Sequence, residues 1–247
     1  MRVAALYDIH GNLPALEAVL EEVCQANVDL IVVGGDAVVG PMRLETLSCL
    51  LNLDIPVQFI QGNAESEVLA QMQGTTVTVP EPFREGLRWV TGQLYPEYEQ
   101  ELAGWPLTFS TNIPGLGEVL FCHATPRNNT EIFTRLTSED HLLPVFEGVS
   151  AAVVVCGHTH MQFDRMVGRT RVVNAGSVGM PFDDPGAYWL LLGPDVQLRH
   201  TPYDLREAAE RIKATGYPQA IDFSDNNVLS PPTATRALEA FSRAELR

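Results

Sequence analysis

Short apolar runs alternate with helical patterns along the first 200 residues of the chain. Residues 3–7 and 30–33 are continuous apolar runs of strand length, and between them leucine and valine recur every three or four residues. Asn12 and Pro14 stand where the N-cap and the first turn of that helix are expected. This order of strand, helix and strand predicts an α/β fold in which helices cover a parallel or mixed sheet.

The same alternation continues toward the C-terminus. It predicts helices over 44–53 and 204–214, and further strands over 57–60, 119–122, 151–155, 172–173 and 188–192. Residues 83–103 are rich in aromatic side chains and are expected to be helical, without chemistry of their own. We therefore expect one domain over residues 1–247, with a core of about residues 1–200 and a helical C-terminal extension over about 203–247.

Composition and charge narrow the classes of partner. Hydrophobic residues make up 45% of the chain and charged residues 19%, which is typical of a globular protein. The formal net charge of −15 disfavours binding to nucleic acid or to an anionic membrane surface. It does not exclude a small phosphorylated substrate, because bound divalent metal ions reverse the sign of the field inside one cleft.

The cysteines and the N-terminus indicate a cytoplasmic location. Cys24, Cys49, Cys122 and Cys156 form no CxxC pair and are expected as small core residues in a reducing compartment. The N-terminal apolar run leads directly into Asp8, so it predicts a core strand rather than a signal peptide. No apolar run approaches the roughly 18 residues that span a bilayer.

Metal-binding residue types follow five of the apolar runs. They are Asp8, His10, Asp36, Asn63, His123, His158 and His160. Asp8 and His10 are two residues apart, as are His158 and His160, so in extended segments the side chains of each pair point the same way. This mixed set of nitrogen and oxygen ligands suits manganese, iron, cobalt, nickel or zinc better than calcium. Seven ligands are enough for two ions about 3.5–4 Å apart that share one carboxylate.

The order of these motifs resembles that of the calcineurin-like metallophosphoesterases. The resemblance rests on Asp8-x-His10, Gly35-Asp36 with Gly40-Pro41, Gly62-Asn63, His123, and Gly157-His158-x-His160. A further motif from Asn174 to Gly179, which includes Ser177, is similar to the smaller prokaryotic phosphodiesterases. The resemblance implies a two-sheet β-sandwich flanked by helices, with the site at the strand ends.

The resemblance also implies a role for each ligand. Asp8, His10 and His160 would bind the first metal ion; Asn63, His123 and His158 would bind the second; Asp36 would bridge both. Asp36, Asn63 and His123 would thereby be catalytic residues. A hydroxide shared by the two ions would attack phosphorus, and both ions would neutralise the phosphoryl oxygens.

Ala64 departs from the family pattern in this sequence. Many members carry a histidine after Gly-Asn that helps the leaving group to depart, and Ala64 can donate no proton. Efficient hydrolysis of esters with poor leaving groups is therefore in doubt. Glu65 is a substitute acid by proximity alone, and a glutamate is normally ionised at neutral pH.

Two further residues are candidates for substrate binding. Relatives often carry an arginine near the position of Phe182, and without it Arg127 is the motif-linked cation nearest to His123 in the sequence. Arg127 could contact the substrate phosphate or be a solvated loop residue. Asn12 could touch substrate as well as cap the helix that follows it.

The motif set favours an enzyme over the alternatives. The leading interpretation is a phosphodiesterase; a dinucleoside polyphosphate hydrolase or a phosphomonoesterase could use the same site. A non-enzymatic interaction scaffold on this fold, like the retromer subunit that resembles these enzymes, is the rival from another class. Such scaffolds tend to lose ligands, whereas this chain keeps all seven.

Overall fold

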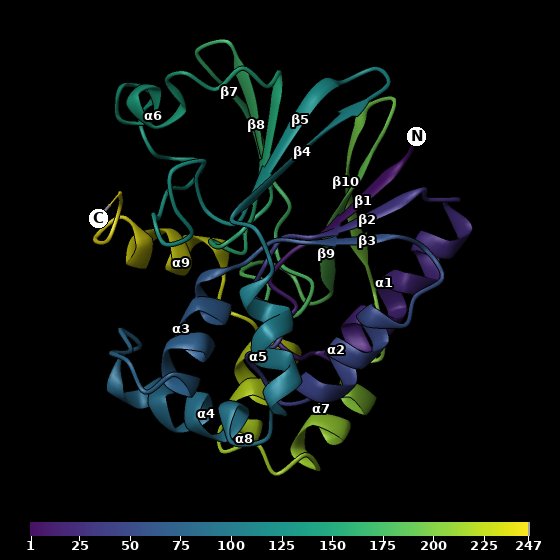
Figure 1. Ribbon diagram of the computed structural model, residues 1–247, viewed down its shortest axis with the longest axis vertical. Coiled ribbons are helices and arrows are strands. Elements are labelled where there is room, and N and C mark those ends of the chain that lie inside the picture. The colour runs from purple at the N-terminus through teal and green to yellow at the C-terminus, as the bar shows by residue number, and fades with distance from the viewer. Residues whose placement is uncertain (247) are drawn as a thin grey trace.

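Two five-stranded mixed sheets pack against each other in the computed structural model, which describes residues 1–246 (Figure 1). The first sheet has the order β10-β9-β1-β2-β3. Its strands are β1 (Val3–Leu6), β2 (Leu30–Val33), β3 (Val57–Phe59), β9 (Ala187–Leu192) and β10 (Val196–Thr201). β1, β2 and β3 run parallel, and β9 is antiparallel to β1.

The second sheet has the order β4-β5-β6-β8-β7. Its strands are β4 (Thr108–Ile113), β5 (Gly117–Cys122), β6 (Val153–Cys156), β7 (Phe163–Val167) and β8 (Thr170–Asn174). β5, β6 and β8 are parallel, and both edge strands are antiparallel to their neighbours. Each sheet therefore contains three neighbouring parallel strands, and the carboxyl ends of these three strands lie at one edge of the sheet.

Alternation along the strands assigns each side chain to one face. Val3 and Ala5 of β1 pack against Val119 and Val155 of the second sheet, in a core between the sheets. The intervening side chains of β1 face the opposite way, onto helices α1 (Leu13–Gln25) and α2 (Arg43–Leu51). Helix α6 (Glu139–Phe146) packs on the outer face of the second sheet. The predicted two-sheet sandwich flanked by helices is thus confirmed.

Most of the remaining helices gather at one end of the molecule. Figure 1 shows α3, α4, α5, α7 and α8 below the sheets. Their bounds, with those of η1 and α9, are α3 (Asn63–Met72), α4 (Glu81–Thr91), α5 (Pro96–Ala103), α7 (Leu205–Lys213), α8 (Ala220–Phe223), η1 (Ser224–Leu229) and α9 (Ala234–Phe241). The helical C-terminal extension forms an apolar cluster around Ile212 and Phe223, packed against Met42 and Met180 of the core. The single-domain assignment stays a prediction.

Sequence patterning found the central strands but missed edge strands. β4, β7 and β10 lie at sheet edges and mix polar with apolar residues, so they lack the continuous apolar signal of a buried strand. The placement of all four cysteines in the core was wrong in part. Cys122 and Cys156 are buried, whereas Cys24 is exposed on α1. Among the described residues, no helix combines the length and apolarity needed to cross a membrane.

Tyr7, the residue that follows β1, links the two sheets. Its buried hydroxyl donates a hydrogen bond to the carbonyl of Val155 at 3.1 Å, from the end of β1 to β6. Tyr7→Phe should lower the free energy of unfolding by about 1 kcal/mol, because this bond is lost without a change in volume. Chemical denaturation in the presence of a chelator measures the change. Tyr95→Phe, at a side chain that is 58% exposed, is the control and should have no effect. Equal stability of both variants would contradict the role of Tyr7.

Candidate metal centre

Five of the seven predicted ligands adopt a left-handed backbone conformation. The φ angles are 53° at Asp8, 48° at His10, 54° at Asp36, 66° at His158 and 57° at His160. This corrects the expectation of extended segments: each pair of side chains converges through tight turns after its strand. Such a conformation costs a residue other than glycine about 1–3 kcal/mol and clusters at functional sites.

Backbone hydrogen bonds hold the two central turns of the first sheet in register. The amide of Asp8 donates to the carbonyl of Gly35 at 3.1 Å, and the amide of His10 donates to that of Asp36 at 2.9 Å. The turn after β1 thus continues alongside the turn after β2. This places the carboxylates of Asp8 and Asp36 next to each other at the edge of the sheet.

The first group of ligands contains Asp8, His10 and His160, whose ligand atoms all lie within 4.8 Å of one another. The Nε2 atoms of His10 and His160 are 3.2 Å apart. Oδ1 of Asp8 lies 3.3 Å from Nε2 of His160 and 3.9 Å from Nε2 of His10. This is the set expected for the first metal ion.

The second group contains Asp36, His123 and His158, with the same spacing limit of 4.8 Å. Asn63 belongs beside it, because its Oδ1 lies 3.0 Å from Nε2 of His123. Asn63 is the first residue of α3 rather than part of a loop. The structure therefore brings all seven predicted ligand residues together.

Asp36 faces both groups. Its Oδ2 lies 3.8 Å from Nε2 of His10, and its Oδ1 lies 3.6 Å from Nε2 of His123. One carboxylate thus directs an oxygen toward a histidine of each group. This geometry fits the bridging role that the motifs implied.

Hydrogen bonds fix which ring nitrogen of three histidines carries a proton. Nδ1 of His123 donates to the carbonyl of Gly34 at 2.9 Å, and Nδ1 of His160 donates to that of Met180 at 2.7 Å. Nδ1 of His10 donates to the carbonyl of Val39 at 3.3 Å. A carbonyl only accepts, so each neutral ring turns an unprotonated Nε2 toward the centre, as metal ligation requires.

Burial keeps the rings of His10, His158 and His160 neutral. It is the main cause that lowers the pKa of both His10 and His160 to about 4 and sets the pKa of His158 well below its usual value. Burial also raises the pKa of Asp8 to about 7 and that of Asp36 to about 6. Both carboxylates thus lie among neutral imidazoles, and a divalent cation would stabilise their ionised forms.

The polar atoms at the centre fit a metal better than they fit one another. The Nε2 lone pairs of His10 and His160 face each other, and neither atom can donate a hydrogen bond to the other. Oδ1 of Asp8 and Nε2 of His158 are buried without a hydrogen-bond partner in the described part of the chain. A cation between these atoms satisfies them together, whereas a proton satisfies only one pair.

Glu65 supports the loop that carries Asp36. Its fully buried carboxylate accepts hydrogen bonds from the backbone amides of Asp36 at 2.8 Å, Ala37 at 2.8 Å, Val38 at 3.3 Å and Gly62 at 2.9 Å. With its oxygens engaged by the backbone, Glu65 is not oriented as the substitute general acid that its position in the sequence suggested. It is a positioning residue.

The motif after β8 supports the turn at Asp8. The hydroxyl of Ser177 donates to the carbonyl of Asp8 at 2.7 Å, and Nδ2 of Asn174 donates to the carbonyl of Gly157 at 2.6 Å. Phe182 stacks on the ring of His160 with centroids 4.8 Å apart. Phe182, at the position where relatives often have arginine, thus packs on the ring of a candidate metal ligand.

The structure places neither predicted substrate-binding residue at the centre. Asn12 is buried and caps α1: its Oδ1 accepts from the amide of Ala15 at 3.3 Å, while its Nδ2 donates to Gly179 and Tyr203. The interpretation of Asn12 as a helix cap is confirmed, and both polar atoms of its amide are engaged by other protein groups. Arg127 pairs with Glu131, with Nε at 3.2 Å from the carboxylate, so its guanidinium is engaged by a neighbouring side chain.

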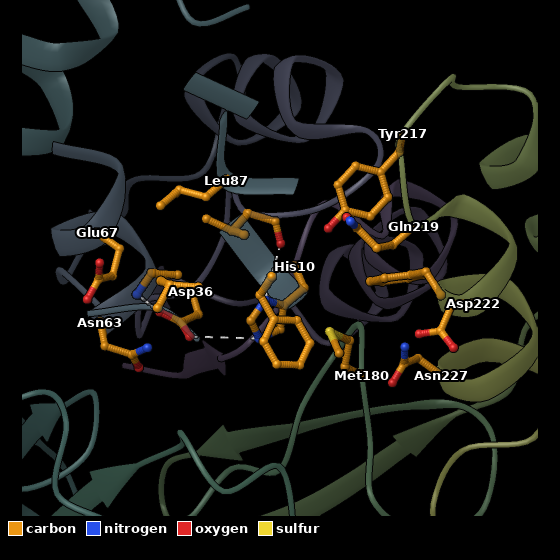
Figure 2. A pocket seen from close by; sticks show the side chains of 15 residues that line it. His10, Asp36, Asn63, Glu67, Leu87, Met180, Tyr217, Gln219, Asp222 and Asn227 are labelled. Atoms are coloured by element: carbon orange, nitrogen blue, oxygen red, sulfur yellow. Dashed lines mark hydrogen bonds and ion pairs between the residues drawn. The ribbon is translucent and has the colours of Figure 1, made fainter. Parts of the chain in front are cut away.

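A cavity of about 230 Å³ opens beside the metal centre. His10, Asp36 and Asn63 line it together with Ala64 and residues of α4 and the C-terminal extension. In Figure 2, Asp36 and Asn63 lie on one side, and Tyr217 and Asp222 lie on the other. The sequence pattern did not predict this wall, to which Phe83 and Leu87 of α4 contribute apolar side chains. The amphipathic pattern of α4 indicates that one face of the helix is buried, but it does not indicate that this face lies beside a cavity.

The fold and the two ligand groups define a phosphoesterase-type metal site, and comparison with known proteins identifies the family. Residues 1–193 match the calcineurin-like phosphoesterase superfamily domain, and the chain belongs to this family. The match ends before the helical extension begins.

Relatives cover nearly the whole chain. An uncharacterized protein of Methanocaldococcus jannaschii is 25% identical over 236 residues, which cover 88% of this chain and 94% of the relative. The crystal structure of a hypothetical protein from Pyrococcus horikoshii matches with a TM-score of 0.80, 21% identity and coverage of 94% of this chain and 99% of the other. A metallophosphoesterase from Sphaerobacter thermophilus matches with a TM-score of 0.70, 24% identity and coverage of 91% and 98%. These two structures support the fold.

Glu65→Gln should weaken metal binding roughly 10- to 100-fold, as is typical when a residue that orients a ligand is changed. The amide introduces an N–H group opposite backbone donors and loosens the loop of Asp36. Metal titration by calorimetry measures the affinity, and circular dichroism checks the fold. Glu97→Gln, at an exposed position on α5, is the control. Unchanged metal affinity in a folded Glu65→Gln protein would show that the loop needs no such support.

Proposed function

We propose that this protein is a metal-dependent phosphoesterase that hydrolyses phosphodiesters with two divalent transition-metal ions. The observation that carries the proposal is the convergence of unprotonated Nε2 atoms and buried carboxylate oxygens at one point. His10 and His160 face each other at 3.2 Å, and Asp36 lies between them and His123. Manganese, iron, cobalt, nickel and zinc all suit this donor set. We place the protein in the cytoplasm as part of the same proposal.

Each residue of the centre has one task. Asp8, His10 and His160 would hold one ion; Asn63, His123 and His158 would hold the other; Asp36 would hold both. Two bound ions would supply a nucleophilic hydroxide at neutral pH and neutralise phosphoryl oxygens. The backbone carbonyls that accept from Nδ1 keep each ring in its ligating tautomer throughout the reaction.

The position of Ala64 limits the chemistry at the leaving group. Ala64 lines the cavity, and its amide donates to Oδ1 of Asp36 at 2.8 Å, so the backbone there orients the bridging carboxylate. Its methyl group transfers no proton, and Glu65 is engaged by the backbone. The departing oxygen must therefore carry its own charge or take a proton from water.

The other candidate activities receive less support. The cavity beside the centre is lined by no lysine or arginine of residues 1–246, which disfavours the extended anion of a dinucleoside polyphosphate. A phosphomonoester could use the same centre. A scaffold without activity needs no matched set of seven ligands, five of them on strained backbone.

Asp36→Asn should remove most activity and weaken both metal sites, because a neutral amide bridges two cations poorly. Its loss should exceed that of His10→Ala, which removes a ligand from one ion only. The measurements are elemental analysis of metal-loaded protein and metal-stimulated hydrolysis of bis(p-nitrophenyl) phosphate. Asp54→Asn, at an exposed position, is the control. Two tightly bound ions and near-normal turnover in Asp36→Asn would contradict the bridge; a metal-loaded parent that hydrolyses no phosphoester would refute the proposed function.

Turnover should depend steeply on the acidity of the leaving group. Nitrophenyl phosphodiesters should react well and alkyl phosphodiesters poorly, since help from a general acid is typically worth about 10²–10⁴-fold. Ala64→His should help poor leaving groups more than good ones, because the position borders the cavity. A series of aryl and alkyl phosphodiesters, measured with both proteins at saturating metal, tests this. A flat dependence in the parent protein would show that another group already protonates the leaving oxygen.

A further inference from the structure

The cavity beside the metal centre has two ends of different character. At one end His10, Asp36 and Asn63 present ligand atoms. The remainder is largely apolar and is lined by Val39, Val79, Phe83, Leu87, Met180 and Tyr217. Figure 2 shows Leu87, Met180 and Tyr217 around the space in front of His10. A group that reaches the centre therefore leaves its remaining part against apolar and aromatic side chains.

The walls of this cavity come from segments that are far apart in sequence and are fixed to each other. Gly86 of α4 lies so close to Tyr217 and Gln219 that a Cβ atom there would sit 2.7 Å from the Tyr217 hydroxyl and 2.4 Å from Oε1 of Gln219. The guanidinium of Arg43 lies 3.9 Å from the ring centroid of Trp89, which in turn meets Tyr217 edge-on at 5.2 Å. The C-terminal extension is thereby held against α4 as a defined wall.

A hydrogen-bonded loop supplies another part of the lining. The carboxylate of Glu67 accepts from the amide of Thr78 at 2.9 Å and thus positions Val79 at the cavity. Phe83 follows at the start of α4 and is 63% exposed, so its ring borders the cavity without belonging to the protein core. The cavity volume of about 230 Å³ lies below the roughly 300–1,000 Å³ of sites for drug-sized ligands. It suits one ring system rather than two nucleosides.

The charged side chains that line the cavity are all acidic within residues 1–246. Glu67 and Asp222 line it, and no lysine or arginine within residues 1–246 does. Asp222 accepts a hydrogen bond from Asn226 at 2.7 Å but is otherwise exposed. With cations at the centre, the field favours an anion there and opposes a second anion at the far wall. A ligand that suits both ends carries its negative charge on the phosphoryl group alone.

We propose that this cavity is a specificity pocket for the organic group of the substrate, and that it selects phosphoesters bearing one uncharged aromatic group. The proposal rests on the proposed function, because the phosphoryl group must be held at the metal centre. Phe83, Leu87 and Tyr217 contact the ring, and Glu67 and Asp222 reject groups with a second negative charge. The C-terminal extension, which lies outside the matched family region, thus determines which substrates bind.

Binding of phosphonates to the manganese-loaded protein tests the pocket without any chemical step. Benzylphosphonate should bind about tenfold more tightly than methylphosphonate, because only the former has a ring to bury. 4-Carboxybenzylphosphonate, which places a carboxylate at the far end of the same ring, should bind about tenfold more weakly than benzylphosphonate. Isothermal titration calorimetry gives the three dissociation constants.

Two variants locate the effect. Phe83→Ala should weaken benzylphosphonate about three- to tenfold, the usual worth of one aromatic contact, and leave methylphosphonate unchanged. Asp222→Lys should strengthen 4-carboxybenzylphosphonate at least tenfold while changing benzylphosphonate little. Tyr95→Ala and Asp140→Lys change an exposed aromatic and an exposed acidic residue outside the cavity, and they should alter none of the three affinities.

The outcomes separate the pocket from the metal centre. Metal-dependent binding of all three phosphonates with equal affinity would overturn the pocket and leave the proposed function standing. Selectivity for the ring that survives Phe83→Ala and Asp222→Lys unchanged would place the ring elsewhere and also overturn it. Failure of every phosphonate to bind in the presence of metal would refute the proposed function and the pocket with it.

Discussion

The rest of the structure depends on one constraint, which is that the lone pairs of several histidine Nε2 atoms converge on the candidate metal centre. Backbone carbonyls accept from Nδ1 of His10, His123 and His160, so each ring is obliged to turn an unprotonated Nε2 toward the centre. Burial keeps the rings of His10 and His160 neutral and raises the pKa of the neighbouring carboxyls of Asp8 and Asp36. A site built in this way binds cations at the cost of its own internal hydrogen bonding.

The two sheets make that arrangement tolerable. Each ligand turn leaves a buried parallel strand, so its first residue is fixed by the ladder before the backbone enters the left-handed region. Glu65 then ties the turn of Asp36 through four backbone amides, and Ser177 ties the turn of Asp8. The strained conformations persist because neighbouring turns from both sheets over-determine them. Tyr7, the residue before Asp8, joins the two sheets through its hydrogen bond to Val155.

The sequence predicted the centre better than its surroundings, for a physical reason. Ligands such as Asp8 and His123 follow buried strands, whose continuous apolar runs are visible without knowledge of the fold. Edge strands such as β10 mix polar and apolar residues and give no such signal. The wall of the cavity was invisible too, because Leu87 and Tyr217 meet only after α4 and the C-terminal extension pack together. An apolar residue that lines a cavity gives the same sequence pattern as one in the protein core.

The candidate metal ligands and most of the cavity wall come from different segments of the chain. Six of the seven candidate metal ligands lie in or beside turns that follow strands, where a small displacement would disturb both ligand groups at once. Much of the cavity wall lies on α4 and on the extension beyond residue 200, and neither contributes a candidate ligand. Substitutions at Phe83 or Asp222 would therefore change the cavity without altering the donor set that would hold the metal ions. Specificity on this fold can be altered while the chemistry is retained, because the two depend on different segments of the chain.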